Sequence, residues 1–300
     1  MSSFGNGHRS ALHITQVPQR VVSLVPSLTE SLFDLGFGNA VVGVTDYCVH
    51  PPSGVRGLPR LGGPKNARVD EIIALKPDLV LANQEENTKA IVEHLEAAGL
   101  KVWMTFPKNA RQVMDVLWVL VGIFQSRPAA MRLETLEIAL DWAESSLVER
   151  PSWMYFCPIW QENDAESGQP GWWMTFNRHT YINDVLRLMG GGNVFADRER
   201  RYPLEADLNK AVAGDPGERD TRYPRVTIEE IIQANPAVIL LPSEPFAFGE
   251  KEREQIRSVL EQTEAVQKGK LTCVDGSLLT WHGTRLARAL NELPHVLEVL

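Results

Sequence analysis

A helix–proline–strand pattern occurs twice in this 300-residue sequence and restricts the folds that the chain can adopt. Residues 71–81 read EIIALKPDLVL, and residues 230–240 read EIIQANPAVIL, 159 positions later. In each copy the proline ends a helical segment, and the apolar run after it has the length of a buried strand. A second pair, LGFGN at 35–39 and MGGGN at 189–193, repeats in the same order at an offset of 154. The sequence therefore predicts two similarly built halves.

Short apolar runs alternate with helical segments in both halves. Parallel strands need crossover connections of this kind, so the pattern predicts an α/β fold. Ser27-Leu-Thr-Glu30 has the spacing of a capping box and predicts the start of the first helix. We expect strands at 20–25, 40–44, 79–82 and 102–106 in the first half and at 153–159, 237–241 and 271–274 in the second.

A long helical stretch separates the two halves and is interrupted near Pro128. We therefore predict two Rossmann-like lobes with mainly parallel sheets, joined by a long spacer helix. In open α/β sheets ligands bind outside the carboxyl ends of the strands, so a cleft between the lobes is the expected site. The expected parts are a flexible tail (1–19), an N-terminal α/β lobe (20–109), a helical spacer (110–150) and a C-terminal α/β lobe (151–300).

Composition and motifs argue against several classes of function. The net charge of −8 is spread along the chain, which does not favour nucleic acid as a partner. Cys48, Cys157 and Cys273 lie far apart without metal-ligand spacing, so we expect neither a disulfide nor a metal site. No P-loop, HExxH or GxSxG motif is present, and Gly190-Gly-Gly192 follows a helix and is interpreted as a helix stop. We expect no catalytic residues and no required cofactor.

The expected location follows from the N-terminal residues. Residues 1–19 lack a basic stretch followed by an apolar run, and no segment reaches the roughly 18 apolar residues of a membrane span. We therefore expect a cytoplasmic protein. A periplasmic or extracytoplasmic location is the alternative if the native precursor starts elsewhere.

Two groups of residues are candidates for ligand contact. Trp281, His282 and Arg285 follow a strand and open a helix, a position that suits a large planar ligand carrying acidic groups. Trp160 and Trp172 flank the polar segment 161–170, which is interpreted as a lid, although both indoles would also fit in a core beneath it. Further candidates, in comparable loop positions, are Tyr47 and Arg178.

The residues just described resemble a known family. RVVSLVPSLTE at 20–30, Tyr47 with Pro51-Pro52, and the segment at 71–80 are similar to the helical-backbone (class III) substrate-binding proteins of ABC transporters, in particular to their cobalamin-binding receptors. The resemblance extends over most of residues 20–300. It implies two Rossmann-like lobes joined by a long helix, and reversible binding of a corrinoid, haem or ferric siderophore for import.

The resemblance also implies roles for individual residues. Asp70 and Glu229 stand at the positions where such proteins dock to a membrane permease, and the internal repeat makes these two positions equivalent. Pro64 and Asn83 stand where the cobalamin receptor has tryptophans, which leaves the ligand open among metal chelates. We expect a monomer. The positions that correspond to ligand contacts are Ser27, Tyr47, Tyr223, Ser277 and Trp281.

Two rival hypotheses belong to other classes. A corrinoid- or haem-handling cytoplasmic protein or enzyme on the same scaffold would use His282 with Asp275 or Asp46 as an acid/base set. An interaction module would use the charged segment 202–224, whose composition is more typical of a solvated surface excursion.

Overall fold

The computed structural model describes residues 14, 16–147 and 152–297, and the chain forms two compact units. The N-terminal unit contains the chain up to Ala139 together with Trp281–Ala287. The C-terminal unit contains Leu140–Thr280 and the residues from Arg288 onward. The boundary at Leu140 falls inside the long helix α6 (Arg127–Ser145), so a continuous helix joins the units.

The segment between the two sheets contains two helices. Helix α5 (Ala110–Phe124) ends at Gln125, whose φ of 53° is left-handed and stops the helical hydrogen bonds. Helix α6 then begins beyond Ser126, whose hydroxyl accepts from the amide of Ala129. The spacer is therefore interrupted at the position that Pro128 indicated in the sequence.

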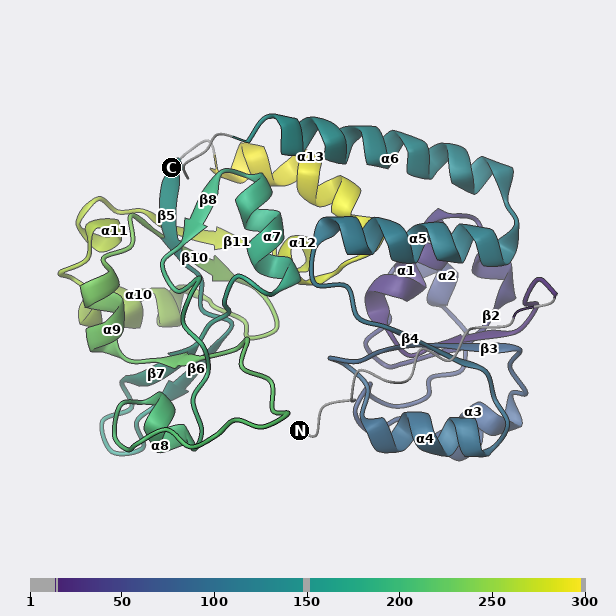
Figure 1. Cartoon of the computed structure of the whole chain (residues 1–300), viewed down its shortest axis with the longest axis horizontal. Coiled ribbons are helices and arrows are strands. Elements are labelled where there is room, and N and C mark those ends of the chain that lie inside the picture. Colours follow the sequence, from purple (N-terminus) through teal and green to yellow (C-terminus); the bar gives the residue numbers. More distant parts are fainter. Residues whose placement is uncertain (1–13, 15, 148–151, 298–300) are drawn as a thin grey trace. The chain divides into compact units, whose positions relative to one another are not determined.

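The N-terminal unit is built on one parallel sheet with helices on both faces (Figure 1). Its strands are β1 (Val21–Ser23), β2 (Val41–Val44), β3 (Leu79–Asn83) and β4 (Val102–Thr105), in the order β2-β1-β3-β4. Its helices are α1 (Pro26–Asp34), η1 (Gly38–Ala40), α2 (Pro52–Val55), α3 (Val69–Ala74), α4 (Lys89–Ala97) and α5.

Strand β3 shows why this sheet forms. All five of its residues are buried, as expected for a strand covered on both faces. Val80 and Ala82 pack with Ile72 of α3 and Leu95 of α4, whereas Leu79 and Leu81 alternate to the opposite face. Figure 1 shows α3 and α4 on one side of the sheet and α1 and α5 on the other.

The C-terminal unit repeats this sheet. Tyr155 lies beside Phe176 and Asn183 on one face of the sheet, and Phe156 packs with Ile231 and Ile256 on the other. The strands β5 (Trp153–Phe156), β8 (Gly191–Asn193), β10 (Val238–Pro242) and β11 (Leu271–Val274) are parallel, in the order β8-β5-β10-β11. The helices are α7 (Tyr181–Leu188), α8 (Leu204–Asp207), α9 (Ile228–Ala234), α10 (Glu250–Val259), α11 (Glu264–Gln267), α12 (Ser277–Thr280) and most of α13 (Arg285–Leu297).

The internal repeat found in the sequence is a structural repeat. An offset of 159 places β3 on β10 and the start of α3 on the start of α9. The backbone hydrogen bonds repeat as well: Val80 donates to Lys101, and Ile239 donates to Lys270 at the equivalent place. Both sheets have the same strand order, so the predicted two-lobed parallel α/β fold is confirmed.

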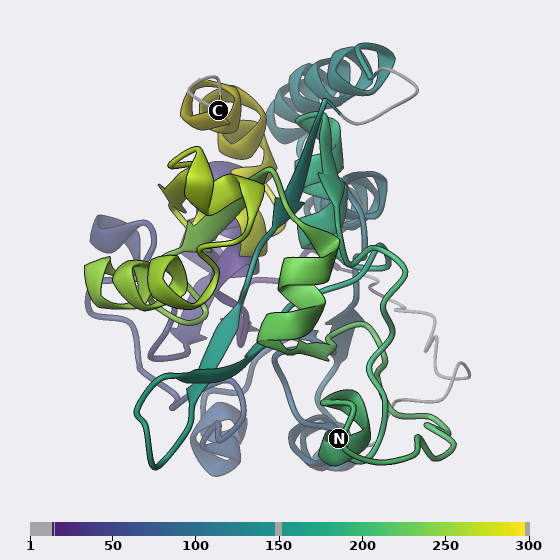
Figure 2. The ribbon, with the colours of Figure 1, turned by 90° about the vertical axis from the view of Figure 1, so that its left-hand side faces the viewer.

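A small antiparallel sheet in the C-terminal unit corrects the interpretation of 161–170 as a lid loop. Strands β6 (Trp160–Asn163) and β7 (Pro170–Met174) form a hairpin, and β9 (Arg225–Val226) pairs with β7 (Figure 2). The sequence did not show the alternation of apolar and polar residues that is typical of a strand, because the buried residue Gln161 is polar. Its side-chain amide accepts from the indole of Trp173 and donates to Gln255. The tip of the segment, 164–169, remains a turn.

Two local predictions also need correction. Ser27 and Glu30 do not form a capping box, because Pro26 is the first helical residue and Val25 is the cap, so that Ser27 lies inside α1. Gly190, with φ +80°, does stop α7 as expected, but the residues after it form strand β8, which the sequence did not predict.

Candidate functional site

The topology of the N-terminal sheet indicates where a ligand would bind in this unit. From β1 the chain passes to β2 on one side and then to β3 on the other, so the strand order reverses between β1 and β3. Ligands of open α/β sheets bind outside the carboxyl ends of the strands at such a reversal. Ser27 follows β1 and Asn83 ends β3, which places both at this switch point.

His282 bridges these two strand ends. Its Nδ1 lies 3.3 Å from Ser27 Oγ, and its Nε2 lies 3.2 Å from Asn83 Nδ2. The amide of Asn83 is oriented by the Glu85 N–H, which donates to its Oδ1, so Nδ2 is the atom that donates to His282. Nε2 therefore accepts and Nδ1 carries the proton, which makes this imidazole neutral.

The burial of His282 has an electrostatic consequence. Its side chain is 5% exposed, and desolvation lowers its pKa to about 4. The neutral ring is thus the stable form over the physiological range. Because Ser27 and Asn83 occupy both nitrogens, His282 serves to position the chain around it rather than to face a large ligand.

The residues after His282 fasten the same segment to helix α1. Arg285 is 3% exposed and forms a bidentate ion pair with Glu30, at 2.7 Å from Nε and 2.5 Å from Nη2. Thr284 donates its amide to Ser31 Oγ at 3.0 Å and its hydroxyl to Asp34 at 2.7 Å. Burial raises the pKa of Asp34 above its usual range. Segment 281–287 is therefore an integral part of the N-terminal unit.

The aromatic surface of the N-terminal unit consists of Trp281, the neighbour of His282 in the chain, and Tyr47. Trp281 is half-buried, with the Arg285 guanidinium 4.5 Å from its ring centroid and the His50 ring edge-on at 5.6 Å. Tyr47 is 63% exposed in the loop that follows β2. A Cβ at Gly63 would lie 2.4 Å from Asn66 Oδ1 and 3.4 Å from the Tyr47 ring, so this glycine leaves space chiefly for Asn66 beside Tyr47.

The loop that carries Tyr47 and His50 is held in place by buried contacts. Arg60 Nη1 donates to the carbonyl oxygens of Thr45 and Cys48, at 3.0 and 2.8 Å. The Cys48 thiol lies 3.1 Å from the hydroxyls of Thr29 and Thr45. Burial raises the pKa of this thiol, so Cys48 acts as a packed anchor and not as a reactive thiolate.

The C-terminal unit has its own switch point, between β5 and β10. Trp160 follows β5, and Phe246 lies in the loop after β10, so both are at the carboxyl ends of these strands. Their ring centroids are 5.4 Å apart, and the ring centroids of Phe246 and Phe248 are 4.8 Å apart. Trp160 is 42% exposed, so aromatic rings reach the surface at this switch point. The switch point of the N-terminal unit has polar side chains instead.

The other predicted contact residues of the C-terminal unit lie on several elements. Trp172 is half-buried on β7, and the Arg225 guanidinium lies 5.9 Å from its ring centroid. The Arg222 guanidinium lies 5.2 Å from the ring centroid of Tyr223. Arg178 forms an ion pair with Asp197. Ser277 begins α12 and is 8% exposed. Trp172 thus lies on the strand that pairs with the strand of Trp160, and the other three residues lie on separate elements or loops.

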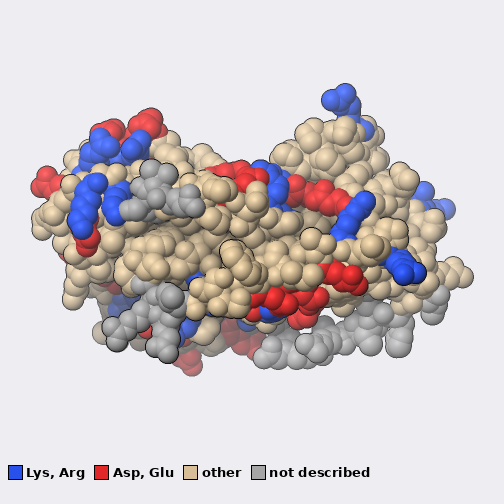
Figure 3. Space-filling view, turned by 90° about the horizontal axis from the view of Figure 1, so that it is seen from above, with Lys and Arg blue, Asp and Glu red and all other residues tan. Residues whose placement is uncertain are grey.

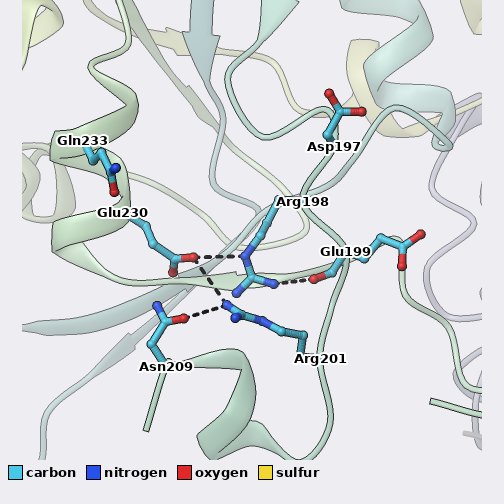
Figure 4. Close-up of a pocket in the computed structure, with 7 residues that line it drawn as sticks. All are labelled: Asp197, Arg198, Glu199, Arg201, Asn209, Glu230 and Gln233. Carbon is cyan, nitrogen blue, oxygen red and sulfur yellow. Dashed lines mark hydrogen bonds and ion pairs between the residues drawn. The ribbon is translucent and has the colours of Figure 1, made fainter. Parts of the chain in front are cut away.

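A hollow of about 580 Å³ in the C-terminal unit is lined by charged residues (Figure 4). Arg198 pairs with Asp207 and Glu230, each at 3.0 Å, and Arg201 donates to Asn209 at 2.8 Å. Because these charges neutralise one another, the network braces segment 198–209 against α9. The lining residues are Asp197, Arg198, Glu199, Arg201, Asn209, Glu230 and Gln233.

The two residues expected to dock to a permease are exposed and equivalently placed. Asp70 is the second residue of α3, and Glu229 is the second residue of α9. The amide at the helix start and the Thr227 hydroxyl lower the pKa of Glu229. Figure 3, which is viewed from the side of α6 and not from that of α3, shows both basic and acidic side chains on that face.

Sequence reasoning missed several residues of the site. His50 and Arg60 were not predicted, whereas Asn83 and Glu30 were named in the sequence without the contacts that they make with His282 and Arg285. Asn83 was open to prediction, since a polar residue that ends a buried strand next to a sheet reversal is unusual. Among the described residues, no group of three or more His, Cys, Asp or Glu side chains is arranged to hold a metal ion.

Comparisons with known proteins agree with this geometry. The family model described as "Periplasmic binding protein" matches residues 21–110. The vitamin B12-binding protein of Photorhabdus laumondii subsp. laumondii is 28% identical over 192 residues, 62% of this chain and 64% of that protein, so the match spans under two thirds of it. The uncharacterized ABC transporter substrate-binding lipoprotein YvrC of Bacillus subtilis is 25% identical over 93% of this chain and 80% of its own length. The predicted resemblance is confirmed.

Solved structures show the same fold. The periplasmic vitamin B12-binding protein BtuF of Vibrio cholerae superposes with a TM-score of 0.68 at 21% identity, covering 94% of this chain and 98% of that one. The periplasmic heme-binding protein RhuT of Roseiflexus gives 0.67 at 22% identity, covering 93% and 97%. The curated relatives described above are named as binding proteins, in agreement with the predicted class.

The expected cytoplasmic location is contradicted. The relatives are periplasmic proteins or, in Bacillus subtilis, a lipoprotein, and so are extracytoplasmic. The expectation rested on the composition of residues 1–19, most of which lie outside the described residues, whereas the comparison rests on the folded domains.

Among the described residues, no helix combines the length and the apolar content needed to cross a membrane.

The close fit of Gly283 against α1 gives the first prediction. Its φ is +92°, and a Cβ there would lie 2.3 Å from Ser31 Oγ and 3.2 Å from the Ser27 carbonyl oxygen. Gly57 has a similar φ of +82° with open space around it. We expect Gly283→Ala to lower the free energy of unfolding by roughly 2–4 kcal/mol and Gly57→Ala by about 1 kcal/mol, since only the first adds a clash to the strain. Urea denaturation measures both, and equal losses would contradict the proposed packing.

The buried His282 gives a prediction for pH. Its pKa of about 4 in the folded protein lies below the usual 6.5, so the unfolded chain takes up the proton first as the pH falls. The contribution of neutral His282 is complete above about pH 6.5 and is lost as the pH falls through 4. We expect the stability difference between the wild type and His282→Gln to shrink by roughly 3 kcal/mol over this range. Denaturation at several pH values tests this, and a difference independent of pH would refute it.

Proposed function

We propose that this protein is the substrate-binding component of an ABC importer and reversibly binds a corrinoid or a related metal chelate such as haem or a ferric siderophore. The observation that carries the proposal is the half-buried ring of Trp281, next to His282 at the switch point of the N-terminal unit, together with the exposed Tyr47 in the loop after β2. Large planar ligands gain most of their affinity from such surfaces. The names of the relatives support the class of ligand.

The supporting layer explains how this surface would bind without doing chemistry. Ser27, Asn83 and His282 satisfy one another, and Arg285 is paired with Glu30. Their polar groups therefore fix the backbone beneath Trp281, and the ligand is treated as cargo rather than as a cofactor. In the part of the chain that the structure describes, the two nitrogens of His282 contact Ser27 and Asn83, and these contacts favour a positioning role over the rival acid/base set with Asp275 or Asp46.

The aromatic surface of the C-terminal unit extends the proposal. Trp160 and Phe246 present apolar rings at the equivalent switch point, and Trp172 and Tyr223 lie on neighbouring strands or loops. Arg178 is half exposed beside Asp197 and is available to an acidic group of a ligand through a change of partner. We propose that these residues contact the ligand from the C-terminal unit.

Titration tests the ligand class. Cyanocobalamin, dicyanocobinamide, haemin and a ferric siderophore are added to the protein, and tryptophan fluorescence and ligand absorbance are followed. We expect saturable binding of at least one ligand at micromolar concentration. Failure of all four to bind would refute the proposed function.

Trp281 provides a matched pair of variants. We expect Trp281→Ala to weaken binding by roughly 10- to 100-fold, because a large apolar side chain buried against a ligand contributes about 1.5–3 kcal/mol. Trp142→Ala, which removes a 73% exposed indole on α6, should leave the dissociation constant unchanged. Equal effects of the two substitutions would place the ligand elsewhere.

The docking role of Asp70 and Glu229 is tested separately from binding. In cells whose growth depends on uptake by this protein, we expect Glu229→Arg or Asp70→Arg to abolish growth at limiting ligand while leaving the dissociation constant unchanged. Charge reversal on this scale disrupts a complementary interface through repulsion. Glu264→Arg, at the start of another exposed helix, is the control and should have no effect. Normal growth of both docking variants would contradict the assignment.

A further inference from the structure

His50 differs from His282 in the hydrogen bonds of its ring nitrogens. It lies in the loop after β2, its ring is half exposed, and it makes a T-shaped contact with the ring of Trp281. In the part of the chain that the structure describes, neither nitrogen of His50 makes a hydrogen bond or an ion pair. An imidazole with an unshared lone pair therefore stands on the aromatic surface proposed to meet the ligand.

The position of His50 is fixed although its nitrogens are unused. The Arg60 guanidinium holds the carbonyl of Cys48 at 2.8 Å, and the buried Cys48 thiol anchors the same loop to Thr29 and Thr45. The amide of Asp46 donates to Gly62 at 2.9 Å, which ties the loop to the adjacent segment. A donor held in this way loses little entropy when it forms a bond.

We propose that His50 coordinates the metal of the bound chelate as an axial ligand. The proposal rests on the proposed function and deepens it, because it specifies a chelate whose metal has an exchangeable axial position. Imidazole is a common ligand of iron and of other transition metals, including the iron of haem. In the binding step a nitrogen lone pair of His50 forms a bond to Co(III) or Fe(III), and an axial water leaves. The oxidation state of the metal does not change.

The orientation of Trp281 fits this role. An axial imidazole stands roughly perpendicular to the plane of the macrocycle that it ligates. The planes of His50 and Trp281 meet at 73°, so the indole can lie along a macrocycle whose metal is bound by His50. One loop and one neighbouring segment would then supply both the coordinate bond and the apolar contact.

Two cobinamides that differ in their axial ligands test the inference. Diaquacobinamide carries exchangeable water, whereas cyanide fills both axial positions of dicyanocobinamide. We expect the wild type to shift the visible absorption bands of diaquacobinamide, and His50→Ala to abolish the shift and weaken binding by about tenfold or more. Both proteins should bind dicyanocobinamide equally, which also shows that the variant is folded. His94→Ala, which removes an exposed histidine on α4, should behave as the wild type.

A second probe and a rescue experiment complete the test. Ferric haemin added to the wild type should become low-spin, and His50→Ala should leave it high-spin until free imidazole is supplied. Identical spectra and affinities for the wild type and His50→Ala with both open-site probes would overturn this inference, while the proposed function stands. Absence of binding by these probes, and by cyanocobalamin and the ferric siderophore as well, would overturn the proposed function and this inference with it.

Discussion

The buried ion pair between Arg285 and Glu30 is the interaction on which the proposed site depends. It joins residues 255 positions apart and holds a segment from near the end of the chain on the first helix. Removal of one partner from such a pair leaves an uncompensated buried charge, at a cost of about 3–5 kcal/mol. With the contacts of His282 it fixes Trp281, so the N-terminal unit is complete only when the segment 281–287 packs on residues from the first part of the chain.

Two layers with different chemistry follow from this anchoring. One layer consists of Ser27, Asn83 and His282, whose polar groups hydrogen-bond to one another. The other is the aromatic surface of Tyr47 and Trp281. A satisfied polar layer specifies one arrangement of the backbone, because any other would leave a buried donor or acceptor unpaired. The aromatic rings are thereby held in position before a ligand arrives, and binding costs less ordering of the chain.

The sequence predicted the scaffold better than the site. The helix–proline–strand repeat is a local pattern set by periodicity and by proline, and it located β3 and β10 to within a residue. The burial of His282 and Arg285 depends on contacts with Ser27, Asn83 and Glu30, whose distance in the chain hides them from local patterns. Glu30 illustrates this difficulty: its spacing from Ser27 indicated a helix cap, and only the folded chain shows its ion pair.

The two halves of the chain also show how ligand preference separates from fold. Gln84 donates its amide to Thr105, and Ser243 donates its amide to Val274 at the equivalent position, so the backbone geometry at these strand ends is the same. The residue that ends the strand is nevertheless Asn83 in one half and Pro242 in the other. Sheet hydrogen bonds use the backbone alone, which leaves the side chains at the strand ends free to vary. Corrinoid and haem receptors can therefore share this scaffold, and the residues that select the ligand are those at the strand ends and in the loops after them.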